Sequence, residues 1–166
     1  MEDGSSSGEG RKERPWWFMM AVVGGIGAAV LLVMGAILAG VAIPAYRSKV
    51  VATNESAALS YLGEIAAQQH VYLTSTGNYA SFRELVAAGL IDVRFDSDQP
   101  VLNGYSFTMK VTPRTESQPP FFSVNADPVD KQGFTPTGKR HYYLDSETAG
   151  IRYHEERPAT ATDRAR

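Results

Sequence analysis

One segment constrains this chain more than any other: an uncharged run that extends from Trp16 to Tyr46. It holds about 30 residues, whereas about 20 apolar residues are enough for a helix to cross a bilayer. With 43% hydrophobic and 20% charged residues, the composition as a whole would suit a soluble protein. The run argues against a purely cytosolic globular protein. It predicts a transmembrane helix over residues 15–46, with the lipid bilayer as a partner.

The flanks of this run predict how the helix sits in the membrane. Pro15 suits the first turn of a helix, and Trp16 and Trp17 are typical of a membrane interface. The run is longer than the apolar part of a cleaved signal peptide, which favours an uncleaved signal anchor. Three basic residues precede the run and two follow it, so the positive-inside tendency favours a cytoplasmic N-terminus. Residues 1–14 are Gly, Ser and charge, and predict a disordered cytoplasmic tail.

Small residues recur at four-residue spacing inside the membrane run, as in Gly24/Ala28 and Gly35/Ala39. Such spacing places small side chains on one helix face, which allows close packing of helices in lipid. The alternative is that Gly and Ala are simply common in membrane helices. Near the end of the run, Pro44 removes one backbone hydrogen bond and is expected to kink the helix.

After Pro44 the pattern becomes one-sided, which predicts an amphipathic helix that continues the membrane helix to about Thr74. The charged residues Glu55 and Glu64 are expected to lie largely outside the apolar stripe. This face needs a partner to cover it. The stripe that we expect to pack in the head comprises Val51, Ala58, Leu62, Ile65 and Tyr72, with Gln69 on the same face.

The rest of the chain predicts one short helix and then strands. Ser81 and Glu84 fit a capping box that opens a helix over residues 82–88. From Tyr105 to Thr112 apolar and polar residues alternate, the pattern of a half-buried strand, and they alternate again around Val124. Two further strands are expected over residues 140–145 and 151–154, after a Pro- and Gly-rich excursion over residues 127–139.

Separate helical and strand segments predict an α+β fold. The second half of the long helix would pack on an antiparallel sheet of three or four strands, because each has an apolar face that needs cover. The head would then span residues 47–154. Residues 155–166 are polar and predict a flexible tail.

The amino-acid composition and motifs argue against most kinds of catalytic and metal-binding site. The chain has no cysteine, which excludes disulfides and thiolate sites, and its net charge of −2 gives no footprint for nucleic acid. Its three histidines lack metal spacing, and no nucleophile elbow or phosphate loop occurs. We expect no enzyme activity, cofactor or metal. Tyr142, Tyr143 and Tyr153 fit either strand pairing or an aromatic ligand surface, and pairing is the simpler interpretation.

Several segments, in their order and spacing, resemble the type IV pilin and pseudopilin family. They are Ala42-Ile43-Pro44-Ala45-Tyr46, Gly77-Asn78-Tyr79, Gly89-Leu90-Ile91-Asp92, Gly104-Tyr105-Ser106-Phe107 and Phe122-Ser123-Val124-Asn125-Ala126-Asp127-Pro128. The resemblance implies a single-pass protein of the bacterial inner membrane with a periplasmic head. Its function would be structural or accessory in a type IV pilus or a type II secretion-like system. Other pilin-like subunits or that machinery would be partners.

The chain departs from the family where processing takes place. Pilins carry a basic leader that ends in glycine, followed by phenylalanine or methionine and a Thr-Leu-Ile-Glu-like stretch. Counted back from Pro44, the cut would fall near Val22-Val23 and the glutamate near Gly27, and neither feature is present. We therefore expect an uncleaved protein that acts alone or as an accessory, and the alternative within the family is an atypical subunit that enters a filament. The alternative function is a membrane-anchored periplasmic binding or sensory module, with its contact surface on the loop over residues 127–139.

Overall fold

A computed structural model describes residues 15–131, 136–148 and 150–166 of the chain. The tail predicted over residues 1–14 lies outside these ranges. The chain divides into two compact units, Met1–Pro44 and Ala45–Arg166. We call them the N-terminal unit and the head unit.

The N-terminal unit is helical where it is described. Helix α1 (Trp16–Ile37) contains no buried residue, and a π-helical segment, η1 (Leu38–Ala42), follows it. Among the described residues, one helical stretch, from Trp16 to Thr76, is long and apolar enough to cross a membrane. Most of the large apolar side chains exposed in the chain belong to its first half. A hydrocarbon environment, unlike water, would solvate such a surface favourably.

The π-helical segment was not expected from the sequence. The N–H of Ile43 donates to the carbonyl of Leu38, five residues back, instead of the usual four. Pro44 has no N–H, so the helical ladder is interrupted at this point and cannot be regular. Wider turns of this kind are a common way for a helix to absorb such a break.

Helix α2 (Ile43–Thr76) carries the predicted stripe into the head unit. Val51, Ala58, Leu62 and Ile65 are buried, together with Gln69. Tyr72 is partly buried against the same core. Glu55 departs from the expectation, since its side chain is only 12% exposed. It lies four residues after Val51 and three before Ala58, which puts it on the stripe.

The described residues form one antiparallel sheet of six strands, in which every strand pairs with its neighbours in the sequence. Four of them match the expected strands; the two additional strands, at the sheet edges, hold two residues each, too few to produce an alternating pattern. The fold is thus α+β with more strands than predicted. The strands are β1 (Val101–Leu102), β2 (Tyr105–Thr112), β3 (Phe121–Pro128), β4 (His141–Asp145), β5 (Arg152–His154) and β6 (Arg164–Ala165).

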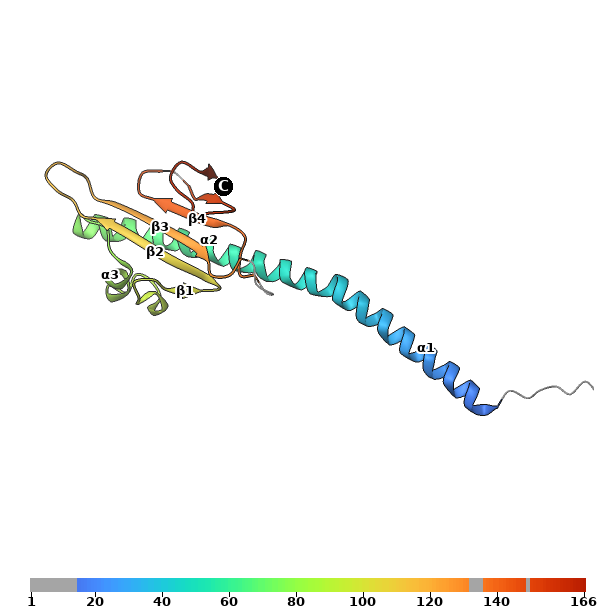
Figure 1. Ribbon diagram of the computed structural model, residues 1–166. Helices are drawn as coiled ribbons and strands as arrows, with labels where there is room; N and C mark the ends of the chain where they lie inside the picture. Colours follow the sequence, from blue (N-terminus) through green and yellow to red (C-terminus); the bar gives the residue numbers. More distant parts are fainter. Residues whose placement is uncertain (1–14, 132–135, 149) are drawn as a thin grey trace, which may run out of the picture. The chain divides into compact units, whose positions relative to one another are not determined.

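The core of the head unit lies between α2 and one face of this sheet (Figure 1). Leu62 and Ile65 from α2 share a single apolar cluster with Phe107 of β2, Val124 of β3 and Tyr142 of β4. The short helix α3 (Phe82–Ala87) adds Phe82 and Leu85 to this cluster. Ser81 and Glu84 form the predicted capping box at its start. A 3₁₀ turn, η2 (Val93–Phe95), completes this side and buries Phe95.

The opposite face of the sheet is partly covered by the chain's last residues. Asn125 on β3 donates to the carbonyl of Ala159 at 2.8 Å, and Ala159 is buried. Arg157 forms two hydrogen bonds with the carboxylate of Asp163, at 2.9 and 2.7 Å. These contacts, and the pairing of β5 with β6, give residues 155–166 a defined place that their polarity did not predict.

Candidate functional site

A polar region of the head unit lies where Asn54 and Glu55 of α2 meet residues 137–140. The side-chain amide of Asn54 donates to the carbonyl of Thr137 at 2.9 Å. The carboxylate of Glu55 accepts from the backbone N–H of Lys139 at 2.9 Å and of Arg140 at 3.3 Å. Two neighbouring residues of the helix thus hold the segment that leads into β4.

The opposite side of this segment is fixed by Tyr105 on β2. Its hydroxyl donates to the carbonyl of Arg140 at 2.9 Å, and burial raises the pKa of this tyrosine. Gly138 passes so close to the ring that a Cβ there would lie 2.1 Å from the hydroxyl oxygen, a separation no side chain tolerates. Residues 137–140 are therefore clamped between a helix and a strand, and glycine is required in their middle.

Arg140 lies at the centre of the region and makes three electrostatic contacts. Its guanidinium is 3.4 Å from Glu55, 3.6 Å from Glu155, and stacks over the ring of Tyr153 at 5.3 Å from the ring centre. Burial is the largest single effect on Arg140 and would lower its pKa, but Glu55, Tyr142 and Glu155 together outweigh burial and raise the pKa. The side chain stays charged, and two carboxylates and one aromatic face hold it in place.

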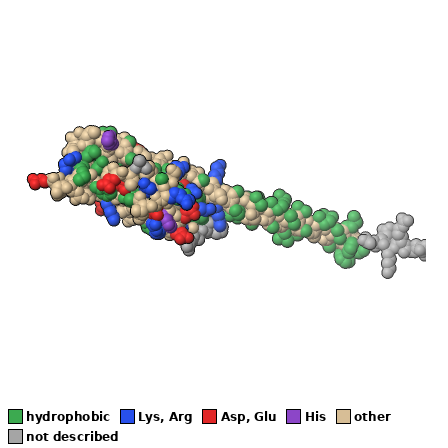
Figure 2. Space-filling view, turned by 90° about the horizontal axis from the view of Figure 1, so that it is seen from above, with side chains coloured by type: hydrophobic (Ala, Val, Ile, Leu, Met, Phe, Trp, Pro, Cys, Tyr) green, Lys and Arg blue, Asp and Glu red, His purple; other side chains and the backbone are tan. Residues whose placement is uncertain are grey.

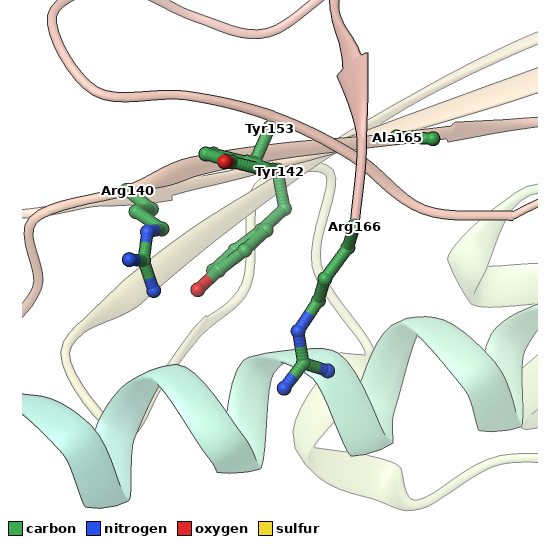
Figure 3. A pocket seen from close by; sticks show the side chains of 5 residues that line it. All are labelled: Arg140, Tyr142, Tyr153, Ala165 and Arg166. Carbon is green, nitrogen blue, oxygen red and sulfur yellow. The ribbon is translucent and has the colours of Figure 1, made fainter.

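A cavity of about 200 Å³ opens beside this arginine (Figure 3). The side chains of Arg140, Tyr142 and Arg166 point from the sheet toward the helix below them. Burial raises the pKa of Tyr142 to about 12, so its hydroxyl is neutral and can donate a hydrogen bond. With two guanidinium groups and the neutral hydroxyl of Tyr142, this cavity suits a small anion. It is lined by Arg140, Tyr142, Tyr153, Ala165 and Arg166.

A second cavity, also of about 200 Å³, shares Arg140 with the first and is lined in part by α2. Its only basic side chains are Lys139 and Arg140, and its acidic ones are Glu55 and Glu155. Both acids already pair with Arg140. The remaining lining consists of Ser48, Val51 and Ala52.

A third polar arrangement lies on the sheet face remote from α2. The Nδ1 atom of His141 on β4 is 2.5 Å from the Asp127 carboxylate on β3. The Nε2 atom of His141 is buried and has no hydrogen-bond partner among the described residues. For this pair to activate a nucleophile, that nucleophile would have to hydrogen-bond Nε2, and no described residue does so. Among the described residues, no three His, Asp or Glu side chains could together hold a metal.

The residues predicted from the sequence are distributed over both units. Gly24, Ala28, Gly35 and Ala39 are exposed on the N-terminal helix, where a single chain cannot test whether they pack against another helix. Pro44 is exposed and follows the π-helical segment. Tyr142 and Tyr153 are cross-strand partners, and the same two residues line the cavity of Figure 3. The pairing interpretation of Tyr142 and Tyr153 thus matches the structure, and a ligand surface stays a prediction.

Sequence reasoning missed Glu55, Lys139 and Arg140 as a connected group. The position of Glu55 on the stripe was a usable signal, because a carboxylate at a core-facing position needs donors close by. Its partners are more than 80 residues away in the sequence, and no local pattern identifies them. The excursion over residues 127–139 was expected to start at Asp127, which instead belongs to β3.

Comparison with known proteins adds no outside information on this region. No family model, no curated protein and no solved structure matches the chain. The assignment of a function therefore depends on its own residues and their arrangement.

Proposed function

We propose that this chain is a non-enzymatic, pilin-like, single-pass membrane protein that serves as a structural or accessory component of a type IV pilus or a type II secretion-like system. In this proposal the N-terminal unit crosses the bacterial inner membrane with the N-terminus in the cytoplasm. The head unit lies in the periplasm and offers surfaces to other subunits or to the machinery.

One observation carries the proposal: the stripe of α2 that follows directly on a 22-residue apolar helix is buried under an antiparallel sheet. The first part of such a helix is suited to lipid, and its second part forms half of a protein core. The helix therefore joins a membrane anchor to a head without a linker. Pilin-like proteins have this architecture. Among the segments that resemble the family, Pro44 lies near the start of α2, Gly77 directly follows its end, and Phe122 lies on β3.

The absence of a processing motif makes an uncleaved accessory protein the preferred version. Without cleavage the protein keeps the residues before Pro15, and no new amine forms near Val23 for a neighbouring glutamate to bind. A subunit that remains anchored would act at the membrane, as a base or partner of a filament.

The test has two parts, carried out on the full-length protein in a bacterium that has a pilus system. Membrane fractionation with alkaline extraction should leave the protein in the membrane pellet. Mass spectrometry of the purified protein, co-expressed with a prepilin peptidase, should find residue 1 or 2 at its N-terminus. A new terminus near Val23, or recovery in filaments sheared from the cell surface, would overturn the uncleaved version. Release by alkali would overturn the membrane anchor itself.

The cavity of Figure 3 favours a second candidate, a membrane-anchored binding module for a small anion. Two arginines and two tyrosines around about 200 Å³ suit a carboxylate or phosphate group. Titration of the full-length protein in micelles with acetate and with inorganic phosphate, followed by NMR of the tyrosine ring signals, tests it. A response that Arg140→Gln and Arg166→Gln each weaken would support the binding module. No shift up to 50 mM anion, a ceiling of our choosing, would contradict it.

A further inference from the structure

We propose that the basic side chains at the start of the head unit, Arg47, Lys49, Lys139 and Arg140, form a collar that binds the headgroups of anionic phospholipids in the membrane crossed by the N-terminal unit. This inference depends on the proposed membrane anchor and not on any role in a filament.

The first argument is the distance along the chain. The uncharged run covers about 30 residues, so as a helix it extends about 45 Å. That length matches the full bilayer of about 40–45 Å, headgroup layers included. Lys49 follows the end of the run at Tyr46 by three residues, or about 4.5 Å of helix. Its long side chain can therefore reach back to the phosphate layer.

The second argument is that the fold brings cations from a distant part of the chain to this place. Asn54 and Glu55 hold residues 137–140 against α2. Glu55 lies six residues after Lys49, about 9 Å along the helix. Lys139 and Arg140 line one cavity with Ser48, which precedes Lys49. Blue side chains gather in Figure 2 over this part of the head unit.

The third argument concerns which of these charges are already neutralised. Glu55 and Glu155 pair with Arg140. The Glu55 side chain is only 12% exposed, so its charge is neutralised inside the head unit. Lys49 and Lys139 are exposed, and within the described ranges neither pairs with a carboxylate. These two lysines therefore provide most of the attraction for an external anion. A layer of lipid phosphates supplies such anions at this level of the chain.

The expected effect is measurable. One basic residue near an anionic membrane surface contributes a factor of about five in lipid preference, so two should contribute about 25-fold. The full-length protein is placed in nanodiscs of equimolar phosphatidylglycerol and phosphatidylcholine and released into the gas phase. Native mass spectrometry then counts the lipids of each kind that remain bound. Wild type should retain phosphatidylglycerol, and Lys49→Gln/Lys139→Gln should lower that preference 10- to 30-fold.

A matched control removes the same charge elsewhere: Lys110→Gln/Arg164→Gln changes two exposed cations, on β2 and β6. It should change the preference less than two-fold. Equal loss in both double variants, or no preference in wild type, overturns the collar. A change in the number of protein chains per nanodisc, with lipid retention constant, also overturns it and identifies a second copy as the occupant. Alkaline extraction of each variant distinguishes failure of the collar from failure of the membrane anchor. Release of the protein by alkali contradicts the proposed function, whereas a protein that stays in the membrane pellet allows the lipid counts to test the collar.

Discussion

At the scale of single residues, two polar side chains on the buried stripe of α2 bind backbone groups from other segments. Glu55 accepts from the backbone before β4, and Gln69 both donates to and accepts from Ala80. Both therefore satisfy groups that would otherwise be buried without partners, which is costly. These hydrogen bonds explain why an otherwise apolar stripe includes an acid and an amide.

Gln69→Leu is predicted to destabilise the head unit by about 2–4 kcal/mol, because it leaves the N–H and carbonyl of Ala80 buried and unpaired. Leucine has a similar size, so cavity formation contributes little. Urea unfolding of the full-length protein in micelles measures the change. Gln68→Leu, at the half-buried neighbour, is the control and should change the free energy of unfolding by less than about 0.5 kcal/mol.

Glu55→Gln is predicted to cost about 1–3 kcal/mol, since a neutral amide weakens the charge-assisted bonds to Lys139 and Arg140 and turns an NH₂ group toward other donors. Hydrogen exchange should accelerate at residues 137–140 before the rest of the sheet. Glu64→Gln, at an exposed position of the same helix, should leave exchange unchanged. If both variants behave alike, the clamp does not hold this segment.

At the scale of elements, an ion pair between Arg157 and Asp163 holds the C-terminal segment. The hydrogen bonds from Arg157 hold the pKa of Asp163 well below its usual range, and the hydroxyl and N–H of Thr160 add to this. The loop between Arg157 and Asp163 is thereby closed without cysteine. It keeps Ala159 over the sheet, where Asn125 binds its carbonyl.

The pH dependence of this loop follows from the direction of that pKa. The ionised carboxylate stabilises the folded segment above the unfolded-state pKa of about 4. The contribution is lost as the pH falls through the lower folded-state pKa. Carbon-13 NMR of the Asp163 carboxyl should therefore show titration below pH 4. Arg157→Gln should move it upward and increase proteolysis within residues 155–166 at neutral pH; a titration that stays unchanged would show that Arg157 does not hold the carboxylate.

Several elements could be predicted from the sequence because their signals are local. The alternation from Tyr105 to Thr112 gave a strand with the bounds that the structure has, and Ser81 with Glu84 gave the capping box. Strands β1 and β6 could not be predicted, since two residues carry no period and their pairing depends on neighbours. The candidate site was missed for the same reason: its contacts join α2 to a segment more than 80 residues away.

At the scale of the whole molecule, the two units meet at Pro44, whose missing N–H interrupts the helical ladder. Pro44→Ala is predicted to restore a hydrogen bond to Gly40 and stiffen this point. Spin labels at positions 31 and 64 should show a narrower distance distribution, with unfolding of the head unit unchanged because Pro44 is exposed. Ile43→Val serves as the control, since it leaves the backbone bonds intact. An equally broad distribution in Pro44→Ala would place the flexibility elsewhere.

The order of the strands bears on how such a chain reaches its native state. Every strand of the sheet hydrogen-bonds to the one just before or after it in the sequence. Most pairings are thus formed over short loops, which keeps the entropic cost of closing them low and favours rapid assembly. Each hairpin can form as soon as both of its strands have been synthesised. Newly made protein would then expose few unpaired strand edges to neighbouring molecules.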